Sequence, residues 1–137
     1  LEGHKFKAYL PGGASGGILP SSLRNIPLDY GVKELEEEGC FLGSAAIVIL
    51  SDQDKMKDVG ISLMHFFEEE SCGQCTPCRV GTEKTVKAMK QEKWNRSTLE
   101  DLSLVMSDAS ICGLGQAATN PLNSIIKHFT EELKIHD

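Results

Sequence analysis

The chain has 137 residues, of which 40% are hydrophobic and 25% are charged, so we expect a soluble protein of one domain or two very small ones. Its formal charge of −6 argues against binding to nucleic acid through phosphate contacts. No apolar run approaches the roughly 18 residues of a membrane span, so direct membrane insertion is not expected. Because the chain begins with Leu1 and shows no signal peptide, we expect a fragment or a processed product.

The first 54 residues are rich in glycine and proline and predict a small β-rich segment. Phe6–Leu10 is a candidate strand that ends at a proline–glycine turn, and residues 18–20 form a brief extended piece. Residues 21–38 are irregular and end in a solvated acidic helix or turn. The apolar, β-branched run at residues 45–50 predicts a buried strand.

Residues 55–137 predict four helices with short connections, which is typical of an antiparallel bundle. Thr76 before a proline, Ser97 three residues before a glutamate and Asn120 before a proline are candidate helix starts. The chain is therefore expected to be an α+β protein with a boundary at residues 54 and 55. The candidate core residues of the helices are Val59, Leu63, Phe66, Phe67, Val80, Val86, Met89, Leu102, Val105, Met106, Ala109, Leu122, Ile125, Ile126, Phe129 and Leu133.

Three of the five cysteines, Cys72, Cys75 and Cys78, lie within seven residues. An odd count does not favour a disulfide framework, and the close spacing indicates reduced thiols around a metal. A [4Fe–4S] cluster is commonly held by such a triplet and one remote cysteine. A zinc ion, which usually takes two separated pairs of ligands, is the alternative.

Two cysteines are candidates for the fourth ligand, and both are separated from the triplet by similar lengths of chain. Cys112 lies at a break between helices and precedes Gly113 and Gly115, which let backbone N–H groups approach the sulfur atoms. Cys40 precedes an apolar strand and is interpreted as a small buried hydrophobic residue. We therefore predict that Cys72, Cys75, Cys78 and Cys112 hold the cluster.

Other polar residues near the cysteines have simpler interpretations. Arg79 follows the third cysteine and either offsets the negative charge of a cluster or pairs with the acidic residues 68–70. His65 and His128 are interpreted as ordinary, partly buried histidines rather than ligands. Trp94 is expected to be a packing residue at the end of a helix.

The cysteine motif at residues 70–82 resembles the signature of the flavoprotein (51 kDa-type) subunit of NADH dehydrogenases. Residues 110–121 resemble the segment of that family that carries the fourth cysteine. Residues 5–50 resemble the β-grasp (ubiquitin-like, soluble-ligand-binding-like) domain that precedes the cluster domain in the family, with its start truncated. The resemblance covers nearly the whole chain and implies a partial β-grasp followed by a four-helix bundle that holds a [4Fe–4S] cluster.

The resemblance also implies a function. In subunits of respiratory complex I, NAD-reducing hydrogenases and NAD-dependent formate dehydrogenases, FMN takes a hydride from NADH and releases single electrons to the cluster. The chain would then be the electron-relay part of a cytoplasmic oxidoreductase, or of one at the cytoplasmic or matrix face of a membrane complex, with other iron–sulfur subunits as partners. Residues 56–67, Gln74 and Gln116 are most similar to the formate dehydrogenase branch.

The FMN and NAD sites of the family lie upstream, and nothing in this chain matches them. The glycines at residues 12–17 lack the strand–loop–helix context of a nucleotide fingerprint. No side chain is predicted to be catalytic, and the chain alone is not expected to oxidise NADH. Two further alternatives are a zinc-stapled interaction module without a redox role and a β-grasp domain for a soluble ligand. The ligand-binding alternative is disfavoured because residues 1–50 lack convergent polar groups.

Overall fold

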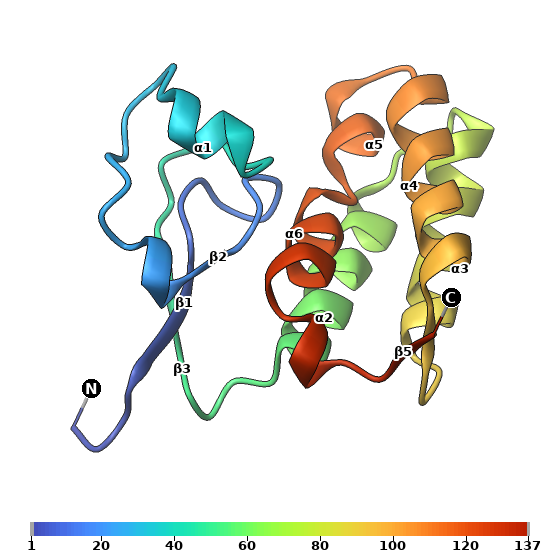
Figure 1. Cartoon of the computed structure of the whole chain (residues 1–137). Coiled ribbons are helices and arrows are strands. Elements are labelled where there is room, and N and C mark those ends of the chain that lie inside the picture. Colours follow the sequence, from blue (N-terminus) through green and yellow to red (C-terminus); the bar gives the residue numbers. More distant parts are fainter. Residues whose placement is uncertain (1, 137) are drawn as a thin grey trace.

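The structure is a computed structural model that describes residues 2–136. It is a mixed helix and sheet protein in which a small sheet region and a helical region lie side by side (Figure 1). The sheet region holds the strands β1 (Phe6–Leu10), β2 (Leu19–Pro20) and β3 (Val48–Ser51) with the short helix α1 (Lys33–Glu37) and a 3₁₀ turn at Ser21–Leu23.

The central strand of the three-stranded sheet is β1, which pairs antiparallel with both β2 and β3. Its last three residues, Ala8, Tyr9 and Leu10, are buried. The prediction of a strand at Phe6–Leu10 is therefore confirmed, and the extended piece predicted at residues 18–20 contains β2.

The prediction of a buried strand over residues 45–50 is wrong in its extent and in its burial. The strand begins only at Val48, because residues 42–45 form a turn in which Ala45 has a φ of 55°. Ile47 precedes the strand and is 51% exposed, and Ile49, in a strand at the edge of the sheet, is 52% exposed. Apolar, β-branched composition indicates a strand, but it does not show whether both faces of that strand are covered.

The helical region consists of three long helices and two shorter ones. The long helices are α2 (Met56–Glu70), α3 (Thr76–Met89) and α4 (Arg96–Ala109), and the shorter ones are α5 (Gly113–Ala117) and α6 (Asn120–His128). Helix α3 packs against both α2 and α4, and α6 packs against α2. Two short parallel strands, β4 (Trp94–Asn95) and β5 (Ile135–His136), and a 3₁₀ turn at Thr130–Glu132 complete the region.

Two details of α4 differ from the sequence prediction. The helix begins at Arg96, and the cap is Asn95, whose side-chain oxygen accepts a hydrogen bond of 2.7 Å from the Thr98 N–H. The predicted cap, Ser97, lies inside the helix. The buried residues of α4 are Leu99, Ser103 and Met106, whereas Val105, predicted to be in the core, is 52% exposed.

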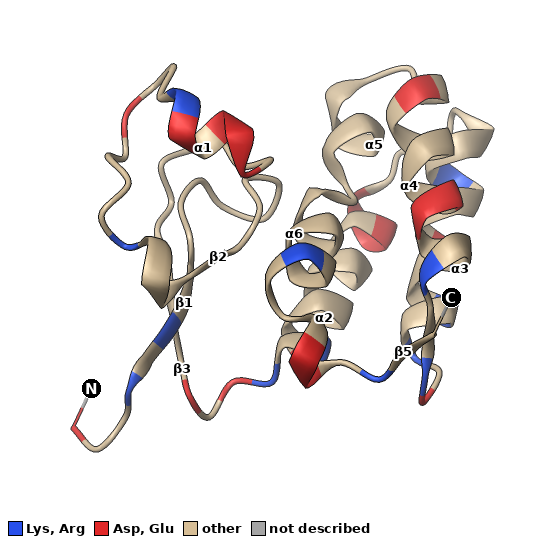
Figure 2. Ribbon diagram, in the orientation of Figure 1, with Lys and Arg blue, Asp and Glu red and all other residues tan. Residues whose placement is uncertain are grey.

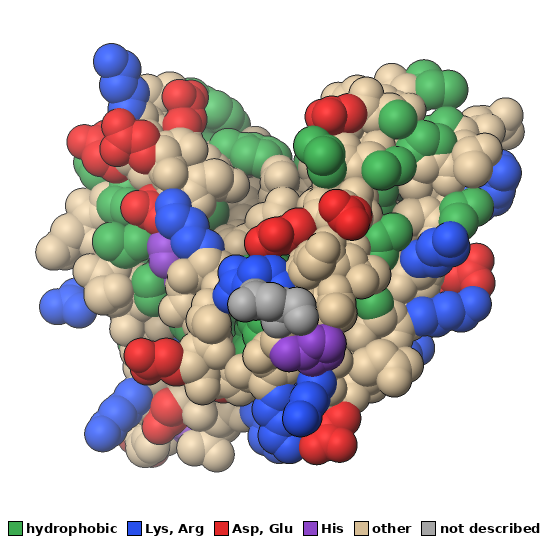
Figure 3. Space-filling view, turned by 45° about the vertical axis from the view of Figure 1, so that its right-hand side comes forward, with side chains coloured by type: hydrophobic (Ala, Val, Ile, Leu, Met, Phe, Trp, Pro, Cys, Tyr) green, Lys and Arg blue, Asp and Glu red, His purple; other side chains and the backbone are tan. Residues whose placement is uncertain are grey.

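Val105 is exposed because it faces an open groove at the surface. It lines a groove of about 670 Å³ between α3 and α4, together with Pro77, Val80 and Leu102. Figure 3, which brings the helical side of the molecule forward, shows hydrophobic side chains on this surface.

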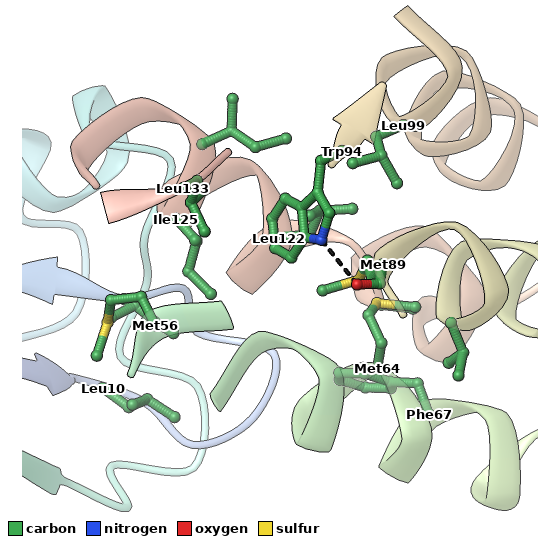
Figure 4. Packing of buried hydrophobic residues seen from close by; sticks show 14 of the residues in the cluster. Leu10, Met56, Met64, Phe67, Met89, Trp94, Leu99, Leu122, Ile125 and Leu133 are labelled. Carbon is green, nitrogen blue, oxygen red and sulfur yellow. Dashed lines mark hydrogen bonds between the residues drawn. The ribbon is translucent and has the colours of Figure 1, made fainter. Parts of the chain in front are cut away.

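The main hydrophobic core joins residues of the sheet region to residues of the helices (Figure 4). Leu10 contributes from β1, Met56 and Met64 from α2, and Ile125 from α6. Trp94, predicted to be a packing residue, is 1% exposed and donates a hydrogen bond of 2.7 Å to the Met89 carbonyl oxygen. The core therefore continues across the expected boundary between residues 54 and 55.

Polar contacts also join the two regions. The Ile18 N–H donates to the Ser124 hydroxyl of α6 at 3.0 Å. Glu38, at the end of α1, pairs with Lys127 at 2.7 Å and with His128 at 3.1 Å. The hydrogen bond from Lys127 lowers the pKa of Glu38, and burial lowers the pKa of His128.

Charged residues are distributed over both regions, and α1 is strongly acidic (Figure 2). No helix within residues 2–136 has both the length and the apolar character that a membrane span requires.

The indole hydrogen bond of Trp94 gives a test of the core. Changing Trp94 to Phe should lower the free energy of unfolding by about 1–3 kcal/mol, because it leaves the buried Met89 carbonyl without its donor and removes packed volume. The matched control is Tyr30→Phe, which removes an aromatic donor from a side chain that is 73% exposed and should change stability by less than about 0.5 kcal/mol. Urea unfolding measures both free energies. An equal loss of free energy of unfolding in Trp94→Phe and Tyr30→Phe would contradict this account of the core.

Candidate metal centre

The four predicted ligands lie at two junctions between helices. Cys72 is exposed in the loop between α2 and α3, Cys75 is the N-cap residue of α3, and Cys78 is buried in the first turn of α3. Cys112 is exposed and is the N-cap residue of α5. Three ligands thus come from one loop and helix start, and the fourth from the connection that follows α4.

Hydrogen bonds from a side chain of the first turn of α3 stabilise the loop that carries the cysteine triplet. Gly73 has a φ of +75°, a conformation that L side chains rarely adopt, so glycine permits the turn between the first two cysteines. The Arg79 guanidinium donates to the Gly73 carbonyl oxygen at 2.5 Å and to the Thr76 hydroxyl at 3.4 Å. No ion pair with residues 68–70 is found for Arg79 in the part of the chain that the structure describes. Arg79 therefore acts as a brace of the cysteine loop.

The segment at residues 110–115 packs directly on the first turn of α3. A Cβ atom added at Gly115 would lie 2.4 Å from the Ser110 Oγ and 2.9 Å from the Cys78 Cβ, so only glycine allows this approach. The Gln116 side chain donates to the Ser110 carbonyl oxygen at 3.0 Å and holds the start of the segment. This contact brings the chain around Cys112 to the triplet.

The environment of Cys75 favours its thiolate form. The backbone N–H of Ile111 lowers the pKa of Cys75, with a smaller contribution from the backbone N–H of Cys78. Because Ile111 directly precedes Cys112, the same segment that carries the fourth cysteine stabilises negative charge on a cysteine of the triplet.

The structure brings these segments together without placing four sulfur atoms in a coordination set. Across residues 2–136, no three His, Cys, Asp or Glu side chains are arranged so that they could hold a metal ion. Cys75 and Cys78 contact the segment at residues 110–115, whereas Cys72 and Cys112 are exposed.

The residues at this junction nevertheless fit an iron–sulfur cluster by their chemistry. Four thiol groups on two adjoining segments are the donor set that a [4Fe–4S] cluster takes. Backbone N–H groups directed at sulfur, as at Cys75, are the usual support of bound thiolates. The Ser110 hydroxyl is buried and has no hydrogen-bond partner among the described residues, which is the arrangement expected beside an additional acceptor.

Cys40 lies away from this junction. It is buried, 2% exposed, beside Tyr9, Leu19 and Leu35. Burial raises the pKa of its thiol to about 11. The interpretation of Cys40 as a small buried residue is therefore confirmed.

The two histidines considered in the sequence have carboxylate neighbours. The His65 side chain is exposed and lies 3.7 Å from Glu68 and 3.8 Å from Glu69, and His128 pairs with Glu38. His65 therefore departs from the expectation of a partly buried histidine, because it lies on the outer side of α2.

Two serines near the cysteines were missed by sequence reasoning. The Ser71 Oγ lies 3.3 Å from the Cys78 Sγ, and Ser110 is packed against Gly115 and Cys78. Ser71 directly precedes Cys72, and Ser110 is two residues before Cys112. A search for hydroxyl groups flanking each cysteine would have found both.

Residues 58–136 match the family model of the NADH-ubiquinone oxidoreductase-F iron–sulfur binding region. The chain is 34% identical to the F 2 subunit of the NADH-quinone oxidoreductase of Rhizobium meliloti, over 99% of this chain and 33% of that protein. It is 37% identical to the mitochondrial NADH-ubiquinone oxidoreductase 51 kDa subunit of Neurospora crassa, over 93% of this chain and 27% of that protein.

The fold is similar to a chain in the crystal structure of an NAD⁺-reducing [NiFe]-hydrogenase in the H₂-reduced state. The TM-score is 0.77 and the sequence identity 28%, and the match covers 95% of this chain and 23% of that chain. The chain thus spans about a third or less of the length of these relatives.

The different surroundings of the thiols predict different reactivities. At pH 8, about one in a thousand Cys40 thiols should be ionised, since its pKa is about 11, and the side chain is also buried. Limited alkylation of the metal-free chain with iodoacetamide, followed by peptide mass mapping, should therefore label Cys75 much faster than Cys40. Labelling of Cys40 at the rate of Cys75 would show that the sheet region is open in solution.

Proposed function

Since the chain belongs to the family of NADH-ubiquinone oxidoreductase-F iron–sulfur binding regions, we propose that it relays single electrons through one [4Fe–4S] cluster. An electron-transfer role for the chain follows from the family. The observation that supports the finer proposal is the packing of the segment at residues 110–115 on the first turn of α3, beside Cys75 and Cys78.

In this proposal, Cys72, Cys75, Cys78 and Cys112 hold the cluster, one thiolate for each iron. When bound, the cluster supplies the ability to accept and release one electron at a time. The chain contributes the four thiolates, the N–H group of Ile111 that favours negative charge on Cys75, and the Arg79 brace that shapes the loop. No side chain of the chain is assigned a role as a general acid or base.

The wider role is proposed from the family resemblance. The electrons would pass between FMN, which exchanges a hydride with NADH or NAD⁺ in an upstream part of the whole subunit, and further iron–sulfur clusters in partner subunits. The names of the relatives support partner subunits, because both relatives are single subunits of NADH oxidoreductases. We place this assembly in the cytoplasm, or at the cytoplasmic or matrix face of a membrane complex. Membership of the formate dehydrogenase branch stays a prediction.

The proposed organisation follows the same resemblance. Residues 1–54 would be a partial β-grasp segment, and residues 55–137 an iron–sulfur domain built on a four-helix bundle. The sheet order β2-β1-β3 and the packing of α3 between α2 and α4 support this division. The shared core joins the two parts through Ala8, Leu10 and Ile18.

Reconstitution of the chain with iron and sulfide without oxygen tests the cluster and its fourth ligand. The parent chain should become brown, bind about four irons and give a paramagnetic signal on reduction. Cys112→Ser should lose or alter that signal, because it removes a ligand. The matched control Cys40→Ser should keep the signal, because this thiol is buried in the sheet region.

Two results would overturn the proposal. A colourless chain with one bound zinc ion would favour a zinc-stapled interaction module. Loss of the signal in Cys40→Ser, with retention in Cys112→Ser, would show that the fourth ligand is misassigned.

A second test asks whether the nucleotide and flavin sites lie outside this chain, in another part of the whole subunit. The reconstituted chain should not oxidise NADH when FMN is added, because the proposal places the nucleotide and flavin sites upstream. The measurement is absorbance of NADH at about 340 nm with an artificial electron acceptor. Turnover above that of free FMN would show that this chain carries a nucleotide site of its own.

A further inference from the structure

The Ser110 hydroxyl is a buried polar group beside the cysteines that lacks a hydrogen-bond partner among the described residues. The residue is 5% exposed, and its Oγ has no hydrogen-bond partner among residues 2–136. A buried hydroxyl without a partner costs about 1–3 kcal/mol, so native proteins rarely keep one without a reason.

The backbone of Ser110 is held by hydrogen bonds on both sides, which fixes the position of its Cα and Cβ atoms. Its N–H donates to the Met106 carbonyl oxygen at 3.2 Å, and its carbonyl oxygen accepts from Gln116 at 3.0 Å. The side chain is packed against Gly115, where an added Cβ would lie 2.4 Å from the Oγ. The Ser110 hydroxyl is therefore enclosed between the end of α4 and the start of α5.

The surroundings of the hydroxyl supply sulfur as the acceptor. Ser110 shares the contact at Gly115 with the Cβ of Cys78, so its hydroxyl lies next to a cysteine of the triplet. The second serine of this junction, Ser71, already has a sulfur neighbour, since its Oγ lies 3.3 Å from the Cys78 Sγ, and it accepts from the Gly73 N–H.

We propose that the Ser110 hydroxyl donates a hydrogen bond to a sulfur atom of the bound cluster or of one of its cysteine ligands, and that it raises the reduction potential of the cluster. This inference rests on the proposed function. Reduction adds one electron and therefore one negative charge to the cluster and its ligands. A donor aimed at sulfur stabilises the reduced form more than the oxidised form.

Ser110→Ala is a suitable test because it removes the hydroxyl and leaves the packing at Gly115 intact. In the metal-free chain it should leave the free energy of unfolding unchanged or raise it, since it removes an unpartnered buried group. The matched control is Ser107→Ala, which removes an exposed hydroxyl of the same helix that bonds to Leu104 and Asp108.

The decisive readout is the midpoint potential of the reconstituted chain, measured by a redox titration that is followed by paramagnetic resonance. Ser110→Ala should bind iron as the parent does but become harder to reduce, with an equilibrium constant for reduction on the order of threefold to tenfold lower. A tenfold change corresponds to about 59 mV for one electron. Ser107→Ala should match the parent. The parent should also show one proton coupling to the cluster that disappears on exchange into deuterated water. Ser110→Ala should lack that coupling from the start.

Several results would overturn the inference. An unchanged potential and unchanged proton couplings in a fully loaded Ser110→Ala chain would show that the hydroxyl does not reach sulfur. Failure of Ser110→Ala alone to take up iron would assign Ser110 to assembly rather than to tuning. Failure of the parent chain to bind a cluster would contradict the proposed function itself. This outcome differs from failure of the inference alone, because the parent and Ser107→Ala would then both lack the cluster.

Discussion

The contact between residues 110–115 and the first turn of α3 is the constraint on which the candidate metal centre depends. The triplet lies in one loop and helix start, so local geometry alone can present three thiols. The fourth thiol is carried by a segment that follows the whole of α4. That segment lies against the first turn of α3 because α4 packs along α3 and because Gly115 lets the backbone approach Cys78.

The polar groups around the cysteines favour negative charge through oriented dipoles. Arg79, which directly follows the third cysteine, is engaged with the Gly73 carbonyl oxygen and the Thr76 hydroxyl. The N–H of Ile111 is instead directed at Cys75, and the Ser71 Oγ lies 3.3 Å from the Cys78 Sγ. Because such dipoles are held by the fold, they need little reorganisation when an electron arrives.

Much of the architecture could be predicted from the sequence because the signals are local. The periodic apolar residues of α2 and α6 and the strand at Phe6–Leu10 depend on short-range patterning, and the structure has these elements. The errors arose where tertiary context decides. Ile49 and Val105 have apolar side chains typical of a core, yet Ile49 lies on an edge strand and Val105 faces an open groove.

In the candidate site, too, some features have a local sequence signal and others depend on tertiary contacts. The spacing of the triplet and the glycines near Cys112 predict a ligand set, because a [4Fe–4S] cluster is commonly held by such a triplet and one remote cysteine, and this set stays a prediction. The surroundings could not be predicted in this way. The brace from Arg79 to Gly73 and the buried hydroxyl of Ser110 depend on how α3, α4 and α5 meet.

The central claim is that one [4Fe–4S] cluster is held jointly by the loop before α3 and the segment before α5. The most direct measurement is anaerobic native mass spectrometry of the reconstituted chain. We predict a single species whose added mass equals about four irons and four sulfides for each chain. A dominant species that carries one zinc ion, or a cluster found only in a dimer that shares it between two chains, would contradict the claim.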